Sequence, residues 1–434
     1  MRGTFVAIGA LLLACKGSDA TNEPPPSSDA SADVAADATD SIASDASDAS
    51  GPCGELTSDW KRCPQNPLLT GWRPGPTAGK FEWTLADPSV LFDDDDSKWK
   101  AWWSTVIVAS CADVTDLARR EVSTKYAESS DGFVWTVASD LALASRRGPT
   151  TWDDTTVETP SVIKVKSTPP DRRYVMVYAG GNDALGKFLG QTPWQLGLAF
   201  SADGKHFTRL PASESPYAGK DTTPYTDHEG LVLLGRDAFP SFPSVTAGIV
   251  ADPEIREIAG VFHLWFSSAG VDKDGKVVSD GVKVAYGISH ATSTDLVHWT
   301  MQKDNPAIVG AGQPSVVADA TGFEMWFGRD DSAEVATVPS ALFPTLGFWH
   351  ASSKDGVAWT VSSKRDFVWD QSIASEELGL INGSAVVERG GEYRLYYGAW
   401  TKTKVPSGSC AYVQSGGTIT STPGAFTLDV AMKK

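Results

Sequence analysis

The sequence predicts an all-β chain, a five-bladed β-propeller that follows a disordered N-terminal tether. Three observations predict this fold. A short strand-opening motif returns five times, at intervals of about 60 to 95 residues, which suits a four-stranded sheet with its loops. Each opening is followed by a second strand rich in Trp, Tyr and Phe. An Asp-Gly or Asp-Leu turn before an aromatic residue then closes most of the repeats.

The overall composition narrows the class of protein. The 434 residues are 41% hydrophobic, 10% aromatic and 21% charged, which excludes collagen-like, membrane-spanning and wholly disordered chains. The formal net charge is −17, and no basic run is present. Because phosphate backbones are bound by clustered Lys and Arg, we expect no nucleic-acid partner.

The N-terminal segment has the features of an export signal. Arg2 precedes an apolar run, Phe5 to Ala14, that is too short to span a bilayer. Leu12-Leu13-Ala14-Cys15 resembles the lipobox of bacterial lipoprotein signals, in which the Cys becomes the acylated first residue of the mature chain. An ordinary secretory signal is the alternative. The prediction is a lipid-anchored protein of the bacterial cell envelope.

A tether follows this signal. Between Ser18 and Ser50 there are seven Asp and one Glu and no Lys or Arg, so eight of the 17 net negative charges lie there. This composition cannot bury enough apolar surface to become ordered. We therefore predict a signal over residues 1–14, a disordered linker over residues 15–52 and a propeller domain over residues 53–434, which we expect to be monomeric.

The repeat is defined by its openings, which place a small or acidic residue at the start of a strand, mostly before Pro. The openings are Ala86-Asp87-Pro88-Ser89-Val90, Glu158-Thr159-Pro160-Ser161-Val162, Ala251-Asp252-Pro253-Glu254-Ile255, Gly312-Gln313-Pro314-Ser315-Val316 and Asn382-Gly383-Ser384-Ala385-Val386. The partner strands are Trp99 to Ser104, Tyr174 to Ala179, Phe262 to Ser267, Phe323 to Gly328 and Tyr393 to Ala399. The aromatic faces of each sheet need a neighbouring sheet to cover them, so the terminal blades should meet and close a ring.

Four cysteines besides Cys15 are expected to form disulfides in an oxidising compartment. Three pairings are open, and a zinc site is disfavoured because there is no Cys-x-x-Cys pair. We favour Cys53–Cys63 as a short staple at the start of the domain. We pair Cys111 with Cys410 because they follow the second strands of the first and fifth blades, which a closed ring makes neighbours.

The candidate site follows from the propeller geometry, in which the innermost strands begin around one mouth of a central channel. We expect one residue from each opening to line a single pocket, namely Asp87, Glu158, Asp252, Gln313 and Asn382. Carboxylates that share a cavity repel one another when ionised, which raises at least one pKa. Glycoside cleavage needs such an arrangement, with one protonated acid and one carboxylate as base or nucleophile.

The chain resembles the five-bladed glycosidases of glycoside hydrolase families 43 and 32, the relatives of arabinanase, levansucrase and invertase. The resemblance covers about residues 64 to 430 and rests on the Asn66-Pro67-Leu68-Leu69 lead, Asp87-Pro88, Asp252-Pro253 and the Ser-x-Asp-Gly/Leu-x-x-Trp hairpins. It implies that Asp87 is the general base of an inverting enzyme, or the nucleophile of a retaining one, and that Asp252 tunes the acid.

The expected acid departs from those families, which carry a Glu two residues before a Pro in a later blade. The fourth opening has Gln313 before its Pro, and an amide cannot supply a proton. Glu158-Thr159-Pro160 has the required spacing in the second blade, so Glu158 is the proposed acid. Glu254 is a reserve candidate, because it alternates to the same strand face as Asp252.

Other residues receive simpler interpretations. Trp103, Trp265 and Trp326 lie in second strands and are predicted to be core, whereas four Trp near loops are candidate platforms for sugars. Those four are Trp72, Trp152, Trp349 and Trp400. The run Asp93 to Asp96 is interpreted as a solvated hairpin tip rather than a calcium site. The six His show no metal-binding spacing; His228 and His290 could reach the mouth but are not assigned. We predict no metal and no cofactor.

Three functions remain open. The first is a surface-tethered glycoside hydrolase that acts on polysaccharide side chains of the arabinan or xylan type, with Asp87, Glu158 and Asp252 as catalytic residues and with Gln313, Asn382, Trp349 and Trp400 contacting substrate. The second is a glycan-binding lipoprotein without catalysis, favoured by Gln313. The third is a protein-interaction propeller, which would be supported if the segment Ser213 to Thr246 plugged the channel.

Overall fold

A computed structural model describes residues 51–115, 121–146, 148, 151–185, 188, 192–319, 321–329, 346–377, 379–402, 405, 411–414 and 418–434. The predicted signal over residues 1–14, Cys15 and nearly all of the linker lie outside these residues. Cys410 also lies outside them. Among the residues described, no helix combines the length and the apolar character needed to cross a bilayer.

Antiparallel strands form nearly all of the regular structure described. The strands before the second opening are β1 (Lys61–Arg62), β2 (Leu69–Thr70), β3 (Arg73–Pro74), β4 (Phe81–Glu82), β5 (Ala86–Asp93), β6 (Lys98–Val108), β7 (Glu121–Ser129) and β8 (Thr136–Val137). The next are β9 (Thr156–Lys164), β10 (Tyr174–Gly181), β11 (Gln195–Ser201), β12 (Thr208–Arg209) and β13 (Leu231–Leu233).

The second half of the chain repeats the arrangement. Its strands are β14 (Ala247–Ile258), β15 (Val261–Val271), β16 (Tyr286–Ser293), β17 (Thr300–Met301), β18 (Ile308–Val309), β19 (Ala311–Asp319), β20 (Gly322–Arg329), β21 (Gly347–Ser353), β22 (Thr360–Val361) and β23 (Phe367–Val368). The last are β24 (Gly379–Arg389), β25 (Glu392–Thr401), β26 (Ala411–Gln414), β27 (Thr418–Pro423) and β28 (Ala425–Lys433). Short 3-10 turns are η1 (Cys111–Thr115), η2 (Pro170–Arg172), η3 (Asp183–Leu185), η4 (Ala212–Glu214) and η5 (Gly235–Asp237).

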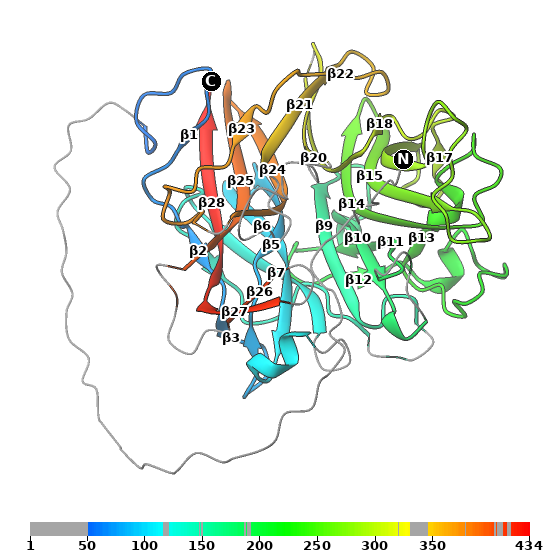
Figure 1. The fold of residues 1–434 in the computed structure, drawn as a ribbon, viewed down its shortest axis with the longest axis horizontal. Coiled ribbons are helices and arrows are strands. Elements are labelled where there is room, and N and C mark those ends of the chain that lie inside the picture. The colour runs from blue at the N-terminus through cyan, green and yellow to red at the C-terminus, as the bar shows by residue number, and fades with distance from the viewer. Residues whose placement is uncertain are drawn as a thin grey trace.

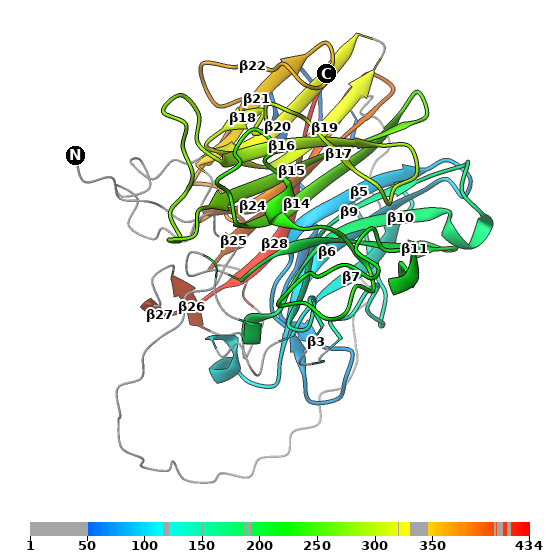
Figure 2. The ribbon, with the colours of Figure 1, turned by 90° about the vertical axis from the view of Figure 1, so that its right-hand side faces the viewer.

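The sheets are arranged in a closed circle, and we name each blade by its inner strand. The inner strands contact one another in the cyclic order β5, β9, β14, β19, β24 and back to β5. Three blades run outward in chain order: β9-β10-β11-β12, β14-β15-β16-β17 and β19-β20-β21-β22. The β5 and β9 blades count as one 11-stranded sheet because a single parallel pair, Val122↔Thr156, joins them. Figures 1 and 2 show these groups of strands from two directions.

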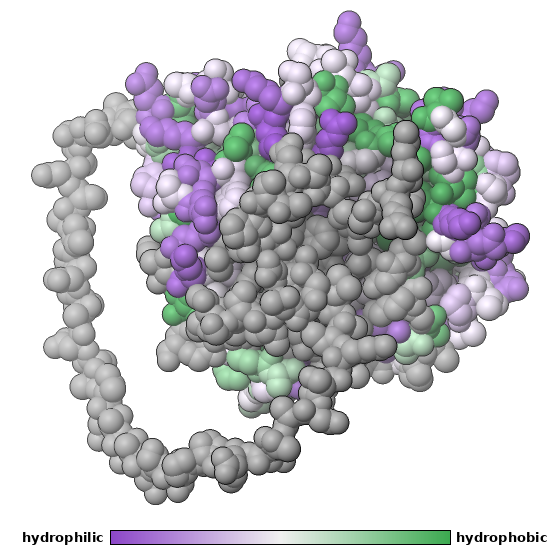
Figure 3. Space-filling view, viewed as in Figure 1, coloured by the Kyte–Doolittle hydropathy of each residue, from purple (hydrophilic) through white to green (hydrophobic). Residues whose placement is uncertain are grey.

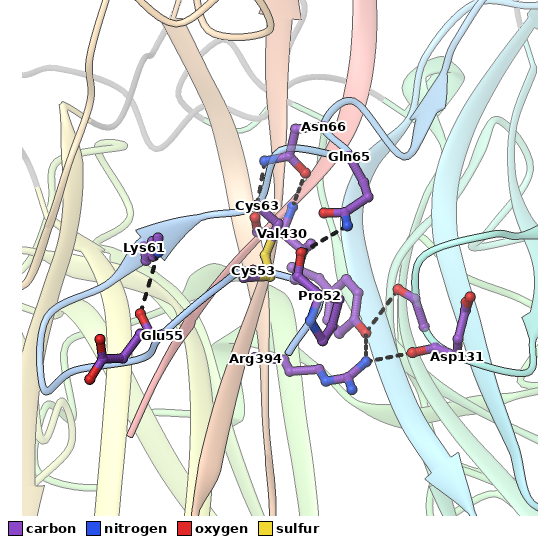
Figure 4. Close-up of a disulfide and its surroundings, with 12 residues drawn as sticks. Pro52, Cys53, Glu55, Lys61, Cys63, Gln65, Asn66, Asp131, Arg394 and Val430 are labelled. Carbon is purple, nitrogen blue, oxygen red and sulfur yellow. Dashed lines mark hydrogen bonds between the residues drawn. A yellow bond between two sulfur atoms is a disulfide. The ribbon is translucent and has the colours of Figure 1, made fainter. Parts of the chain in front are cut away.

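The two ends of the chain close the circle together. The N-terminal strands β1 and β2 pair with the C-terminal strand β28, which pairs with β25 and completes the β24 blade. The predicted disulfide Cys53–Cys63 is present beside this junction (Figure 4), and the side chain of Asn66 exchanges hydrogen bonds with the backbone of Val430. Cys111 is also in a disulfide, and its predicted partner Cys410 lies outside the described residues. The N-terminal segment therefore supplies the outermost strands of the last blade.

The Asp-Gly turns hold neighbouring blades together. In the turn after β7, the amide of Gly132 donates to Ser129 Oγ, and Asp131 Oδ1 accepts two further backbone amides. The Gly carbonyl oxygen then faces the previous blade, where Tyr396 donates to it at 3.2 Å. The same contact recurs from Trp102 to Gly204 and from Trp265 to Gly356. Trp265, Trp103 and Trp326 are all buried, as predicted.

Hydrophobic clusters fill the interfaces between blades. The largest lies between the β9 and β14 blades and contains residues such as Leu198, Phe239 and Phe266. Outside these interfaces, hydrophilic and hydrophobic side chains are mixed over the described part of the face that Figure 3 shows. The core of this fold is thus divided among the interfaces and does not form a single central cluster.

A buried charged cluster supports the closing junction. Glu376 is fully buried, accepts two hydrogen bonds from the Arg62 guanidinium at 2.5 and 2.8 Å, and accepts a third from Tyr397 at 2.7 Å. Asp429 of β28 is also fully buried. Burial and the nearby Glu376 charge raise the pKa of Asp429 to about 7. One Arg therefore faces two buried carboxyl groups.

We expect Asp429→Asn to make stability less dependent on pH. A carboxyl group with a raised pKa stabilises the fold only while it is protonated, so its contribution is complete below about pH 4 and is lost as the pH rises through about 7. The shift corresponds to about 4 kcal/mol at most. Urea unfolding should show that the variant gains stability over the wild type at pH 8 but not at pH 4. An equal difference at both pH values would contradict this.

Candidate functional site

Each inner strand carries a β-bulge at the same level. The strand register shifts between Ala86 and Ser89 in β5, and the other four inner strands shift at the corresponding place. The residue inside each bulge has a positive φ. These residues are Asp87 (52°), Thr159 (48°), Asp252 (48°), Gln313 (58°) and Gly383 (87°). Four of the five are not Gly, and such strained backbone is concentrated at functional sites.

These residues meet at the axis of the ring. They surround a cavity of about 30 Å³, and the residue after each of them, Pro or Ser384, also lines it. A space of this size holds about one water molecule and not a sugar ring. The structure therefore brings Asp87, Asp252 and Gln313 to one place, as the sequence predicted.

Two predicted members of this ring are displaced by one residue. In β9 the bulge residue is Thr159 and not Glu158, and in β24 it is Gly383 and not Asn382. The physical reason is that the bulge falls on the residue directly before the Pro, or before Ser384 in the last blade. Aligning the openings on that position would have found Thr159. Asn382 lies in β24 next to the ring, and its side chain is outside the described part of the structure.

Glu158 lies beside the ring, in a different setting from the aspartates. It is buried, and its Oε1 accepts a hydrogen bond from the indole N–H of Trp194. It is close enough for its charge to raise the pKa of Asp87. Trp194 gives no signal in the sequence, because it comes from the loop before β11.

The carboxyl groups of the ring are held in surroundings that favour their protonated forms. Burial raises the pKa of Asp87 well above its ordinary value, and the charges of Asp252 and Glu158 raise it further. Burial raises the pKa of Asp252 to about 6. The residues that line the cavity include no Lys or Arg. The surroundings of the ring therefore shift both aspartates towards their protonated forms.

Two serines of the second strands support the two aspartates in the same way. Ser104 of β6 donates a hydrogen bond to Asp87 Oδ2 at 3.3 Å and accepts the backbone N–H of Thr159 at 2.7 Å. Ser267 of β15 hydrogen-bonds the Asp252 carboxyl group and accepts the backbone N–H of Gln313 at 2.8 Å. Each hydrogen bond to a carboxylate lowers the pKa of that aspartate and so opposes the effect of burial.

A second layer of side chains joins successive inner strands below the ring. Each member lies two residues after a bulge residue and accepts a backbone N–H of the next inner strand. The pairs are Ser89 with Val162, Ser161 with Ile255, Glu254 with Val316 and Ser315 with Val386. Glu254 is therefore in the place of a linking Ser. It also accepts from Ser161 and pairs with Arg256 at 2.5 Å, so these contacts occupy the reserve acid candidate.

The aromatic residues predicted to contact sugars are mostly covered. Trp400 is 2% exposed, and its ring centroid lies 4.0 Å from that of Phe426. The prediction that Trp400 is a platform for sugars is therefore wrong in this structure. Trp152 is fully buried and stacks on Tyr178. Trp349 is half-buried between the guanidinium groups of Arg329 and Arg365, at 5.1 and 5.3 Å from its ring.

Trp72, like Trp349, is only partly covered. It is partly exposed and stacks on Phe81 with a centroid distance of 5.0 Å, so one face of its indole is already covered. The buried Trp152 and Trp400 are covered by Tyr178 and Phe426, which are distant from them in the sequence.

The remaining predicted features are structural. Asp94, Asp95 and Asp96 are exposed in the turn between β5 and β6, as predicted for a solvated hairpin tip. Asp93 is instead buried and pairs with Lys100 and Lys164. His290 is buried in an aromatic stack with Trp265, and burial lowers its pKa to about 3. His228 contacts Thr222 at 2.6 Å. Within the described residues, no group of three His, Cys, Asp or Glu could hold a metal ion.

The segment from residue 213 to 246 does not line the cavity of the ring. It contributes β13, which pairs with β11 at the outside of the β9 blade. The condition that would have supported a plugged, protein-binding propeller is therefore not met in the described residues.

Comparison with known proteins identifies the fold through structures alone. No family model matches the sequence, and no curated protein matches it. Among solved structures, BT0996 in a complex with RGII has a TM-score of 0.55 at 16% identity, over 87% of this protein and 92% of that one. A glycoside hydrolase has a TM-score of 0.54 at 16% identity, over 87% and 92%.

A third similar structure is an N-acetylgalactosamine deacetylase from F. plautii in complex with blood group B trisaccharide. It has a TM-score of 0.51 at 16% identity, over 86% of this protein and 95% of that one. At these identities the likeness shows the fold alone. The prediction of a propeller fold of the glycosidase type is confirmed.

Gly383 leaves room for Asp87, and we expect Gly383→Ala to disturb it. A Cβ at Gly383 would lie 2.7 Å from Asp87 Oδ1, whereas a Cβ at Gly391 would meet nothing within 4 Å. Both glycines have φ above 80°, so Gly391→Ala is a control for backbone strain. Gly383→Ala should lower the free energy of unfolding by about 1–3 kcal/mol more than the control does. Equal losses of unfolding free energy in the two variants would show that the close approach of Asp87 does not exclude a side chain at position 383.

Proposed function

We propose that this chain is a glycoside hydrolase that acts on polysaccharide side chains of the arabinan or xylan type. The observation that carries the proposal is the pair Asp87 and Asp252, which come from separate blades and line one axial cavity with no cation in its lining. Glu158 adds a third carboxyl group within electrostatic reach. Paired carboxyl groups with raised pKa values are the equipment for hydrolysing a glycosidic bond.

The order in which the aspartates lose their protons suggests their roles. Burial raises the pKa of Asp252 to about 6, and burial together with the charges of Asp252 and Glu158 raises the pKa of Asp87 well above its ordinary value. Asp87 would then protonate the leaving glycosidic oxygen. Asp252 would take a proton from the water whose oxygen bonds to the anomeric carbon. This assignment differs from the roles implied by the family resemblance, in which Asp87 is the base or nucleophile and Asp252 tunes the acid. The charge of Glu158 would help to keep the proton on Asp87.

The finer features belong to the same proposal. Counting the joined β5 and β9 blades separately gives a five-bladed propeller, consistent with the cyclic contacts of the inner strands. The cavity holds a water and not a sugar, so substrate would lie above the ring, at the ends where the inner strands begin. We further propose that lipidation at Cys15 and the acidic linker tether the domain to the bacterial cell envelope.

Asp87→Asn and Asp252→Asn should each reduce kcat on aryl glycosides and polysaccharides by at least about a hundredfold. The wild-type rate should rise with pH through about 6 as Asp252 ionises, and Asp252→Asn should lose this rise. Glu257→Gln, at the exposed end of β14, should keep wild-type activity. Unchanged hydrolysis in Asp87→Asn would remove that residue from the reaction. If the rise in rate with pH were lost in Asp87→Asn and kept in Asp252→Asn, Asp87 would be the base.

The alternative function is glycan binding without cleavage, and Gln313 favours it. An amide stands at the fourth position of the ring and cannot donate the proton that a carboxylic acid supplies. In that case the wild type and Asp87→Asn would bind the same polysaccharides in a glycan array without turnover. Gln313→Ala should weaken that binding at least about tenfold, because it removes a hydrogen-bonding side chain from the ring. Release of reducing sugar by the wild type would exclude this alternative.

A further inference from the structure

Thr159 is an unusual residue for its position. It has a φ of 48° and is 4% exposed. A β-branched residue in this left-handed region is strained, and the strain persists only where the surroundings fix it. Gly would adopt the same conformation without the strain, as Gly383 does in the last blade. The Thr side chain must therefore supply something that the backbone conformation does not require.

The contacts of Thr159 extend to both aspartates. Its backbone N–H donates to Ser104 Oγ at 2.7 Å, and Ser104 donates to Asp87 Oδ2 at 3.3 Å. Its side-chain Oγ1 accepts the backbone N–H of Asp252 at 3.3 Å. A continuous chain of hydrogen bonds thus runs from the Asp87 carboxyl group through Ser104 and Thr159 to the backbone of Asp252.

The chain of hydrogen bonds continues beyond Asp252. The Asp252 carboxyl group bonds Ser267, and Ser267 accepts the N–H of Gln313. In the β5 and β14 blades the link to the next bulge is made by a second-strand serine. In the β9 blade the residue that pairs with Glu158 in the second strand is Ala179, which has no hydroxyl group. Thr159 supplies that missing hydroxyl from the bulge itself.

We propose that Thr159 is a positioning residue that fixes the spacing of the Asp87 and Asp252 carboxyl groups. This inference rests on the proposed function, because the spacing matters where the two groups act on one substrate. The other groups that face the pair are Glu158 from β9, Glu254 with its partner Arg256 from β14, and the uncharged Gln313 and Gly383 from β19 and β24. Unlike these groups, Thr159 hydrogen-bonds both Ser104, which supports Asp87, and the backbone of Asp252.

Three substitutions separate the hydroxyl group from the backbone strain. Thr159→Ser keeps the hydroxyl, Thr159→Val removes it at constant shape, and Thr159→Gly removes both the hydroxyl and the strain. We expect Thr159→Ser to retain kcat within about twofold and the other two to lose at least about tenfold in kcat with little change in KM. Thr159→Gly should unfold at the same or a higher urea concentration than Thr159→Val. A merely structural role predicts instead that activity follows stability.

Ser89→Ala is the matched control. Ser89 accepts the N–H of Val162 at 3.0 Å, so it makes the same kind of link between two neighbouring inner strands, β5 and β9, but lies outside the cavity of the ring. Its loss should lower stability and leave kcat unchanged. Thr159→Val with wild-type kcat would overturn the proposal, as would a loss of kcat in Ser89→Ala equal to that in Thr159→Val.

A second measurement does not depend on turnover. Infrared titration of the unliganded full chain, with Asp87→Asn and Asp252→Asn to assign the carboxyl bands, gives the midpoint of each aspartate. Thr159→Val should move the Asp87 midpoint, because the Asp252 charge that raises the pKa of Asp87 would then act from a different distance. Thr159→Ser and Ser89→Ala should leave this midpoint in place. Unmoved midpoints in Thr159→Val would refute the inference. If the wild type hydrolyses no glycan, the proposed function fails while this titration still decides the role of Thr159.

Discussion

The structure depends on how the free edges of its inner strands are satisfied. Within the described residues, and apart from the single residue pair that joins β7 to β9, each inner strand pairs on one side only. Amide groups on its other edge therefore need partners from elsewhere. Side-chain oxygens of the preceding blade provide them, as Ser89 does for Val162 and Ser315 does for Val386. A hydroxyl group is short enough to reach across the interface, and its hydrogen bond is worth about 1 kcal/mol net. Because an unpaired buried amide is more costly than that bond is favourable, these links also fix the level at which each blade meets the next.

The site lies where the bulges of the inner strands face the axis. Once neighbouring inner strands are held in register, their bulges fall at one height and turn Asp87 and Asp252 towards the axis. Both aspartates are only partly exposed there, and the lining offers no cation. The result is a pair of acids whose proton affinities differ, because Asp87 is also close to the charges of Asp252 and Glu158. The arrangement of strands that fixes the blades therefore also sets the proton affinities of the two aspartates.

The sequence was informative wherever the determinant is local. The Pro after each bulge residue, the aromatic second strands and the Ser-x-Asp turns predict the repeat, and β6 and β10 begin within a residue of the predicted positions. The short staple Cys53–Cys63 was also predictable. The position of the bulge was missed by one residue at Thr159, although the residue directly before the Pro marks it there as in the other openings that contain Pro. The burial of Trp400 could not be read from its neighbours, because Phe426 covers it from the C-terminal strand.

The closing junction explains why one position of the ring is Gly. Around the rest of the ring, each bulge meets a neighbour that follows it in the sequence, and a side chain at the bulge can be accommodated. At the closure, β24 meets β5, whose position is also constrained by the N-terminal strands on β28. Asp87 then lies so close that a Cβ on residue 383 would overlap its carboxyl oxygen. A larger residue there would push Asp87 away from Asp252 or open the ring, so the geometry of the site limits the sequence at the point where the circle ends.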